Sequence, residues 1–339
     1  MRYARVVVSR TGGPEVLEMV SSDVPEPRAG EARVRVLAAG VSYGDVLARA
    51  GVVPDAPKPP FTPGYDVTGT VDRLGPEVTS VTAGTQVTAL LNAGGGYAEF
   101  VCLPADRLVP VPNAVDAVHS AGTVLNYFVA YQMLHRLSSL KPGQRILVHG
   151  AAGGVGTALL QLARHAGLHT FGTASAAKHQ IVSDQGAVPL DYQREDAFKR
   201  VRGLTGDGVD AVYDPIGGAS FLRSYRALRA GGQLVAYGVS RALKDGRRNR
   251  VTAYTSFVSV KALGLLPARR ATFYTANSLE KSQPNAYRED LAAVLRMLAA
   301  GEIEPVIAER IPLAQVARAR ELLERSAVSG KIILTCAHP

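Results

Sequence analysis

A glycine-rich segment carries the clearest chemical signal in this chain. Residues 145–156 read RILVHGAAGGVG, an apolar strand-like run that enters a glycine turn, and the helix-forming stretch TALLQLARHAG follows directly. Glycines in such a turn let the backbone approach a pyrophosphate, whose negative charge is stabilised by the start of the helix. Ala151 replaces the first glycine of the G-x-G-x-x-G pattern, and a purely structural turn is the alternative. The residues that we expect to contact a dinucleotide here are Ala152, Gly153, Gly154, Val155 and Gly156.

The end of the next strand indicates which dinucleotide is bound. In NAD sites an Asp or Glu about 20 residues after the turn holds the ribose 2′-hydroxyl. Here that strand ends in TFGTAS, and the first charged residue after it is Lys178. Hydroxyls and an ammonium bind a 2′-phosphate, which a carboxylate would repel. We therefore predict NADPH as the cofactor, with contacts from Thr173, Ser175, Lys178 and, beyond the third strand, Tyr192.

Composition places these motifs in an ordinary globular protein. Of 339 residues, 47% are hydrophobic and 20% are charged, and the net charge is +9. A basic surface attracts anions, but Trp is absent and the chain has no RNA-binding or zinc-finger pattern, so we expect phosphate-bearing small molecules and no nucleic acid. Two cysteines, no signal-peptide core and no apolar window long enough to span a membrane favour a cytoplasmic protein.

The pattern along the chain predicts two kinds of domain in an α/β fold. Residues 1–112 are rich in short β-branched runs and turns, as in a compact β domain or small, partly open barrel. From 141 to 265, short apolar strands alternate with helices, which is typical of a doubly wound parallel sheet. Two helices and a strand then end the chain. The expected strands of the parallel sheet are 145–149, 169–172, 187–191, 210–213, 233–238 and 258–263, the last helices are 287–300 and 314–326, and the final strand is 331–335.

Several further segments resemble one known family. They read GVSYGD at 40–45, PGYD at 63–66, FGTASAAK at 171–178 and VDAVYDPIGG at 209–218. With the glycine turn, they make the whole chain similar to the zinc-independent quinone oxidoreductases of the medium-chain dehydrogenase/reductase superfamily, and within it to vesicle amine transport protein homologues. The resemblance implies a GroES-like catalytic domain, residues 1–125 and 266–339, and a Rossmann domain that binds NADPH, residues 126–265.

The family's zinc-binding members have metal ligands that this chain lacks. Ser42 and Tyr65 stand where those members have Cys and His, and the seven histidines show no ligand spacing, so we expect no metal. Without a Lewis acid to polarise an alcohol, the favoured substrates are acceptors that are already activated. Quinones, enones and enoyl thioesters take hydride at carbon and spread the resulting charge onto oxygen. We therefore expect an NADPH-dependent oxidoreductase.

The resemblance also suggests catalytic residues. Tyr43 matches a tyrosine that has been assigned a proton-donor role in the enoyl reductase domains of polyketide synthases, although solvent can also supply the proton and Tyr43 can instead pack a cleft wall. Asp45 either orients Tyr43 or caps a helix. Tyr65, in the vacated histidine place, is expected to line the nicotinamide pocket.

Family placement adds cofactor contacts away from the glycine turn. The added residues are Ser42, Asn126, Val129, Gly238, Val239, Ser240, Leu263, Leu265 and Lys331, of which Leu263 and Leu265 are expected to offer backbone groups to the carboxamide. The family pairs the edge strand near 258–265 across a two-fold axis, so a homodimer is expected as well.

Three functions are compatible with these residues. The first is reduction of a free quinone or enone. The second is reduction of an enoyl-CoA or carrier-bound enoyl thioester, to whose phosphates the basic run RALKDGRRNR at 241–250 is suited unless it is simply a solvated loop. The third is an interaction protein that binds NADPH with little turnover.

Overall fold

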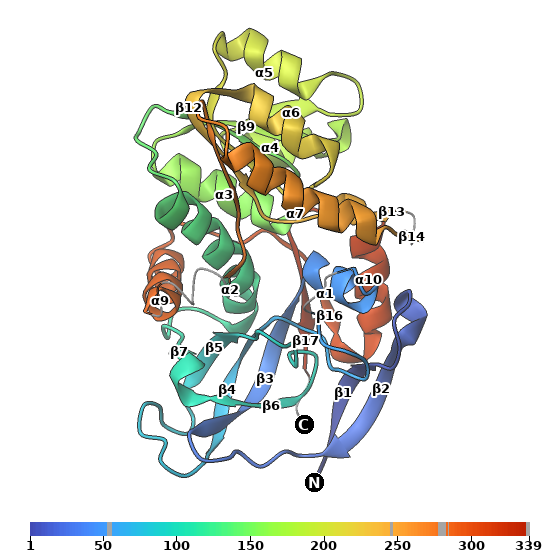
Figure 1. Cartoon of the computed structure of the whole chain (residues 1–339). Coiled ribbons are helices and arrows are strands. Elements are labelled where there is room, and N and C mark those ends of the chain that lie inside the picture. Colours follow the sequence, from blue (N-terminus) through green and yellow to red (C-terminus); the bar gives the residue numbers. More distant parts are fainter. Residues whose placement is uncertain (53–55, 245–246, 277–282, 284, 337–339) are drawn as a thin grey trace. The chain divides into compact units, whose positions relative to one another are not determined.

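The computed structural model describes residues 1–52, 56–244, 247–276, 283 and 285–336 (Figure 1). They form two compact units, Met1–Phe128 with Asn285–Pro339, and Val129–Pro284. The return to the first unit therefore comes later than the expected boundary at 265/266. The reason is that strand β15 (Arg270–Phe273) pairs with β12 (Leu228–Ala236) of the second unit.

The first unit is built on a seven-stranded sheet in the order β16-β17-β3-β4-β5-β7, with β6 paired to β3. All its pairs are antiparallel except β16 with β17. Its strands are β3 (Glu31–Val41), β4 (Asp66–Leu74), β5 (Gln86–Leu90), β6 (Phe100–Pro104), β7 (Val109–Pro110), β16 (Ile307–Pro312) and β17 (Lys331–Thr335), and β1 (Arg2–Val8) pairs separately with β2 (Leu17–Asp23).

Alternation along β3 explains how this unit makes its core. Val34 and Val36 are fully buried, whereas Arg33 and Arg35, which alternate with them, are half-buried, as expected for a strand with one face on the core. The final strand β17 completes the sheet by pairing with β3. The helices of the unit are α1 (Tyr43–Arg49), α9 (Ala286–Ala299) and α10 (Val316–Glu324), while α2 (Ala117–Tyr131) runs through the boundary at 128/129.

The second unit has the predicted parallel sheet, with six strands in the order β10-β9-β8-β11-β12-β15. Its strands are β8 (Arg145–Val148), β9 (His169–Ala174), β10 (Val188–Asp191), β11 (Val209–Asp214), β12 and β15, and its helices are α3 (Gly154–His165), α4 (His179–Asp184), α5 (Ala197–Thr205), α6 (Ala219–Ala227) and α7 (Arg250–Gly264). Strand β8 lies between β9 and β11, so the strand order reverses beside it. Open parallel sheets bind ligands at the carboxyl ends of the strands at such a reversal.

The predicted strand at 258–263 is wrong, because these residues lie in helix α7. The run VSVKAL is apolar and β-branched, and a short apolar run does not distinguish a strand from a buried helix. Asn249 is the residue that indicates the start of a helix here, because its side chain accepts a hydrogen bond from the Thr252 amide and caps the helix. The edge strand expected for dimer pairing is therefore not at 258–265, and β15 occupies that edge of the sheet.

The helices in the described part of the chain are relatively short or polar. None of them is both long and apolar enough to cross a membrane.

Candidate functional site

The glycine turn connects β8 to α3 and leaves the start of that helix open. Gly150 has a φ of +65°, which favours glycine, and Gly153 precedes the helix without any side-chain cap. A Cβ on Gly156 would lie 2.3 Å from the Gly150 carbonyl oxygen, so this position requires glycine. Because the first amides of a helix have no partner within it, an uncapped start on a glycine turn suits a phosphate anion.

Thr173, near the end of β9, holds this turn through two hydrogen bonds. Its carbonyl oxygen accepts from the Ala151 amide at 3.0 Å, and its hydroxyl accepts from the Gly150 amide at 3.2 Å. The Thr173 side chain is 2% exposed. The structure thus gives Thr173 a role in holding the turn, and its direct contact with the cofactor stays a prediction.

Ser175 and Lys178 lie together just beyond β9. A short 3-10 turn, Ala176–Lys178, brings the Lys178 amide back to the Ser175 carbonyl at 2.8 Å. Both side chains are half-buried, and partial burial lowers the pKa of the Lys178 ammonium. Tyr192 follows the neighbouring strand β10 and is 58% exposed. These three residues therefore lie at the same edge of the sheet as the glycine turn.

The segment after β12 reaches that edge too. Gly238 approaches the loop after β11 closely, since a Cβ there would lie 2.9 Å from the Pro215 carbonyl oxygen. The Ser240 amide donates to the same carbonyl at 2.9 Å, and Val239 is buried. Parallel pairing of β8, β9, β11 and β12 thus gathers most of the predicted cofactor residues at one sheet edge.

Leu263 and Leu265 do not belong to this group. They lie at the end of α7, just before β15, and so toward the amino-terminal edge of the parallel sheet. The Leu265 amide is already used by the Ala262 carbonyl, and Leu263 packs into the core. The expected backbone contacts to a carboxamide are therefore wrong for these two residues. Tyr274, directly after β15, lies at the carboxyl edge instead.

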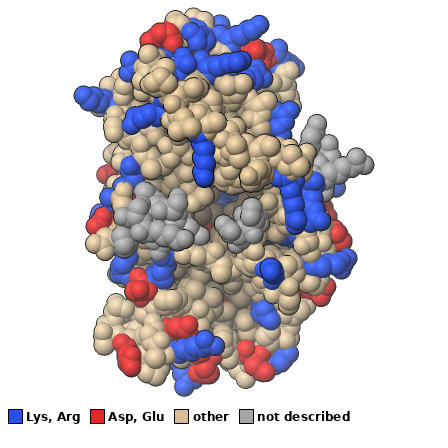
Figure 2. Space-filling model, viewed as in Figure 1, with Lys and Arg blue, Asp and Glu red and all other residues tan. Residues whose placement is uncertain are grey.

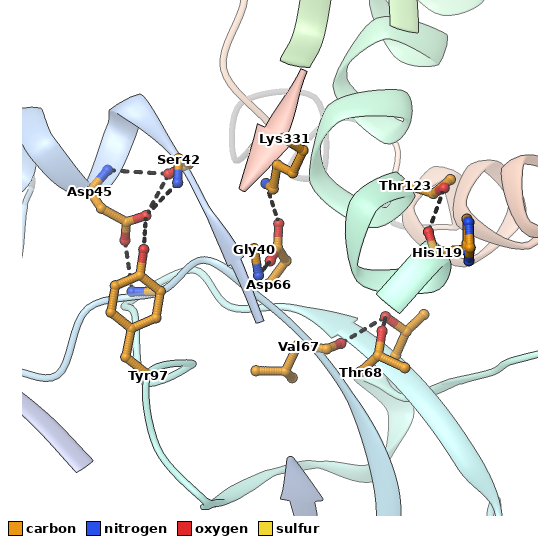
Figure 3. Close-up of polar contacts among 12 residues, drawn as sticks. Gly40, Ser42, Asp45, Asp66, Val67, Thr68, Tyr97, His119, Thr123 and Lys331 are labelled. Carbon is orange, nitrogen blue, oxygen red and sulfur yellow. Dashed lines mark hydrogen bonds and ion pairs between the residues drawn. The ribbon is translucent and has the colours of Figure 1, made fainter. Parts of the chain in front are cut away.

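Asp45, one of the predicted catalytic residues of the first unit, lies with Ser42 and Tyr97 at the start of α1 (Figure 3). Ser42 and Asp45 form a capping box: the Ser42 hydroxyl accepts from the Asp45 amide at 3.2 Å, and the Asp45 carboxylate accepts from the Ser42 amide at 3.0 Å. The same carboxylate accepts from the Gly64 amide at 2.7 Å and from the Tyr97 hydroxyl at 3.1 Å. Asp45 is 1% exposed, so the geometry favours the helix-capping interpretation over a contact with Tyr43.

Two phenols lie beside this capped start. Tyr43 is the first residue of α1. The Tyr65 ring lies beside Gly44, since its Cε2 atom would be 3.5 Å from a Cβ on that glycine. Both phenols are half-buried. Burial raises the pKa of Tyr43, helped by Glu324, and burial together with the Asp45 charge raises the pKa of Tyr65 to about 12. Both groups therefore keep their protons at neutral pH.

Sequence reasoning missed Tyr97 and Arg320 in this cluster. The Arg320 guanidinium is fully buried, lies 5.1 Å from the centre of the Tyr97 ring, and places its Nη2 atom 3.9 Å from Asp45 Oδ1. Helical periodicity puts Arg320 on the same face as Val316 and Ala319 of α10, and an arginine on the apolar face of an expected helix is a signal that could have been used.

Lys331 is buried in an ion pair. Its Nζ atom lies 2.8 Å from Asp66 Oδ2, and it is 3% exposed. A Cβ on Gly40 would lie 2.2 Å from the Lys331 side chain, so glycine makes room for this pair. The ammonium thus joins β17 to β4, which gives Lys331 a structural role, and its expected contact with the cofactor stays a prediction. Asn126 is buried within α2, and Val129 of the same helix is half-buried.

The described residues offer no obvious place for a metal ion. They contain no group of three or more His, Cys, Asp or Glu side chains that could hold one. Ser42 and Tyr65, in the places of family zinc ligands, are used by the α1 cap and by packing against its first turn.

Comparison with known proteins identifies the family. Residues 28–113 match the alcohol dehydrogenase GroES-like domain, and residues 185–334 match the family described as zinc-binding dehydrogenase. A synaptic vesicle membrane protein VAT-1 homologue of Danio rerio is 34% identical over 98% of this chain and 70% of its own length. A quinone oxidoreductase of Pongo abelii is 31% identical over 98% of this chain and 97% of its own length.

A solved structure agrees with these relatives. A mycobacterial protein solved in complex with NADPH is 32% identical, covers 98% of this chain and 99% of its own, and superposes with a TM-score of 0.85. The chain belongs to the quinone oxidoreductase-like medium-chain dehydrogenases/reductases, a family of NADPH-dependent oxidoreductases.

Proposed function

We propose that this chain uses NADPH to reduce a quinone or an activated carbon–carbon double bond. The observation that carries the proposal is the open start of α3 on its glycine turn, with Ser175 and Lys178 at the end of the adjacent strand. The turn's amides suit the pyrophosphate, and the hydroxyl and ammonium suit a 2′-phosphate. No carboxylate follows β9 within TASAAK, where one would favour NADH.

The family relatives support the reaction class. One is named a quinone oxidoreductase, and a solved neighbour holds NADPH. The net charge of +9 favours approach of an anionic cofactor, and Figure 2 shows Lys and Arg side chains gathered around the end of the second unit that carries α5.

In this proposal the protein binds the reactants, excludes water and supplies protons. NADPH, when bound, supplies a hydride to the acceptor carbon, and the electron pair of the double bond moves toward the acceptor oxygen. One net proton then completes either reaction: it reaches carbon in the enolate formed from an enone, or one oxygen of the reduced quinone, whose second hydroxyl hydrogen comes by tautomerisation from the hydrogen added at carbon. We assign the proton-donor role to Tyr43, and Tyr65 is a second phenol beside the same helix start.

The pKa shifts of the phenols predict a simple pH profile. The protonated phenol is the active form, and because its pKa is raised, it loses its proton only at higher pH. The maximal rate with an enone should therefore stay flat from pH 7 to at least about pH 9, below the ordinary tyrosine pKa of about 10. A decline centred below pH 8 would exclude a phenol as the donor.

A second candidate is reduction of an enoyl thioester. It is favoured by Arg241, Arg248 and Arg250, which are exposed around the short hairpin of β13 (Leu243–Lys244) and β14 (Arg247–Arg248). Residues 245–246 of the basic run lie outside the described residues. Coenzyme A carries phosphates that suit this run.

Turnover with a panel of acceptors tests these proposals. NADPH oxidation is followed at the coenzyme's absorbance with simple quinones, enones and short enoyl-CoA esters. Saturable turnover of quinones or enones supports the proposed function, and preference for an enoyl-CoA selects the second candidate. NADPH binding without turnover of any acceptor would favour the interaction protein.

Assembly belongs to the proposal as well. Strand β15 ends the parallel sheet and leaves an edge that a second copy can extend, so we propose a homodimer. Light scattering after gel filtration should give about twice the chain mass of 35.8 kDa.

A further inference from the structure

A buried histidine directly precedes the proposed phosphate-binding turn. His149 directly follows β8 and is 2% exposed. Its Nδ1 atom is 3.1 Å from the Thr173 hydroxyl, and its Nε2 atom is 3.2 Å from the Ser224 hydroxyl of α6. Both ring nitrogens therefore have one hydroxyl partner each.

The neighbours of these two hydroxyls fix the direction of every hydrogen bond. Ser224 donates its one proton to Asp214 Oδ2 at 2.6 Å, so its oxygen must accept from His149 Nε2–H. A neutral imidazole with a proton on Nε2 has a lone pair on Nδ1, so Thr173 donates its proton there. The Thr173 oxygen is then left to accept from the Gly150 amide, as observed at 3.2 Å.

The Asp214 carboxylate closes the chain as a pure acceptor. Ser220 also donates to its Oδ2 atom at 2.7 Å, and the Ile216 amide donates to its Oδ1 atom at 2.7 Å. Asp214 is fully buried at the end of β11. Three donors converge on it, so the carboxylate accepts in every one of these hydrogen bonds.

The charged groups around His149 also favour a neutral ring. Burial lowers the pKa of His149 from its ordinary value of 6.5, Asp214 on β11 opposes this effect, and Arg223 on α6 adds to it. The Phe198 ring of α5 covers the imidazole at 5.2 Å, and the Arg223 guanidinium lies over the same ring at 4.4 Å.

We infer that His149 is a positioning residue for the cofactor. As a neutral Nε2–H tautomer, it anchors the first amide of the phosphate turn to Asp214 through a one-way chain of hydrogen bonds. The chain runs Gly150 N–H, Thr173 O–H, His149, Ser224 O–H, Asp214.

The position of this hydrogen-bond chain in the fold explains how it orders the turn. It ties together the ends of β9, β8 and β11, three neighbouring strands on both sides of the reversal in strand order. Each donor in the chain has its acceptor in place, so the Gly150 amide is held before any cofactor arrives. Because this amide is used within the protein, it fixes the start of the turn, and an anion site that is ordered in advance binds more tightly than one that must first be ordered.

The tautomer is tested directly, and without any cofactor, by nitrogen NMR of histidine-labelled protein. The inference predicts a protonated Nε2 and an unprotonated Nδ1 for His149 at pH 7.5, and the same shifts at pH 6.0, with exposed His169 as the internal reference. The signal is assigned by its loss in His149→Gln. A proton on Nδ1, or a charged ring at pH 7.5, overturns the inference.

The anchoring role is tested by titration with NADPH and NADH, and this second part rests on the proposed function. Thr173→Val removes the hydroxyl and keeps the side-chain shape, so affinity should fall about tenfold, and equally for both dinucleotides because the turn faces the pyrophosphate they share. Thr173→Ser should restore it. Thr255→Val is the matched control, since the exposed Thr255 hydroxyl bonds only to carbonyls of its own helix.

The outcomes separate the two claims. Unchanged affinity in Thr173→Val, or loss for NADPH alone, contradicts the anchoring role. If the wild-type protein binds neither dinucleotide, the proposed function fails while the NMR result still decides the tautomer. If Thr173→Val does not fold, Ser224→Ala breaks the hydrogen-bond chain on the other side of His149. It should lower the affinity for both dinucleotides equally.

Discussion

Helices α1 and α3 both begin next to predicted functional residues, but their starts are built in opposite ways. The α1 start is closed by its own side chains, since Ser42 and Asp45 cap each other's amides. The α3 start has glycine before it and no side-chain cap. The buried carboxylate of Asp45 already brings a negative charge to the first helix, whereas the second helix has room for a charge from outside.

This difference separates binding from chemistry. A closed start repels a further anion and holds nearby groups rigidly, which suits the phenols of Tyr43 and Tyr65. An open start on a glycine turn binds a phosphate. Damage at α3 should therefore weaken cofactor binding, and damage at α1 should change stability or turnover while cofactor affinity stays the same.

The largest expected effect comes from closing the open start. Gly156→Ala places a Cβ against the Gly150 carbonyl oxygen and must shift the turn, so NADPH affinity should fall by at least about 100-fold. Gly203→Ala in α5 is the matched control, because a Cβ there meets nothing within 4 Å. Fluorescence titration measures both. An equal affinity for the two variants would show that the turn does not hold the cofactor.

The next effect is on turnover at α1. Tyr43→Phe should lower the maximal rate with an enone by about 100-fold, as expected for loss of a general acid, with the NADPH Michaelis constant unchanged. Tyr254→Phe, on the exposed face of α7, is the control. A full maximal rate in Tyr43→Phe would remove Tyr43 as the obligatory donor.

Cofactor preference should change by a smaller factor. Lys178→Ala removes an ammonium partner of the 2′-phosphate, so NADPH affinity should fall about 10- to 30-fold while NADH affinity stays constant. Lys199→Ala removes an exposed ammonium of the same unit and should change neither affinity. If both dinucleotides lose affinity together in Lys178→Ala, the assignment to the 2′-phosphate is wrong.

The smallest effect is on stability. Asp45→Asn puts an amide in place of a carboxylate that accepts from Ser42, Gly64 and Tyr97, and should lower the free energy of unfolding by about 1–3 kcal/mol. Urea unfolding measures this against exposed Asp106→Asn. NADPH affinity should not change. A loss of affinity as large as that in Gly156→Ala would contradict the separation of the two helix starts.

The sequence predicted the parts of this molecule that follow local rules. The strand, glycine turn and helix at 145–165 form a continuous pattern, and the structure has β8 and α3 there. Strand β17 at Lys331–Thr335 matches its expected bounds because an apolar run is enclosed by turn residues. The cap formed by Ser42 and Asp45 was foreseeable from its three-residue spacing.

Contacts between distant segments could not be foreseen in the same way. Tyr97 and Arg320 reach Asp45 from 52 and 275 residues away along the chain, and Lys331 meets Asp66 across 265 residues. Helix α7 was mistaken for a strand because β-branched residues fit either element, and its burial against β15 and α6 decided the outcome.

Titration of the wild-type protein with NADPH and NADH, side by side at constant ionic strength, tests the central claim most directly. The open α3 start together with Ser175 and Lys178 predicts that NADPH binds at least about tenfold more tightly than NADH. Equal affinities, or tighter binding of NADH, would contradict this account of the site.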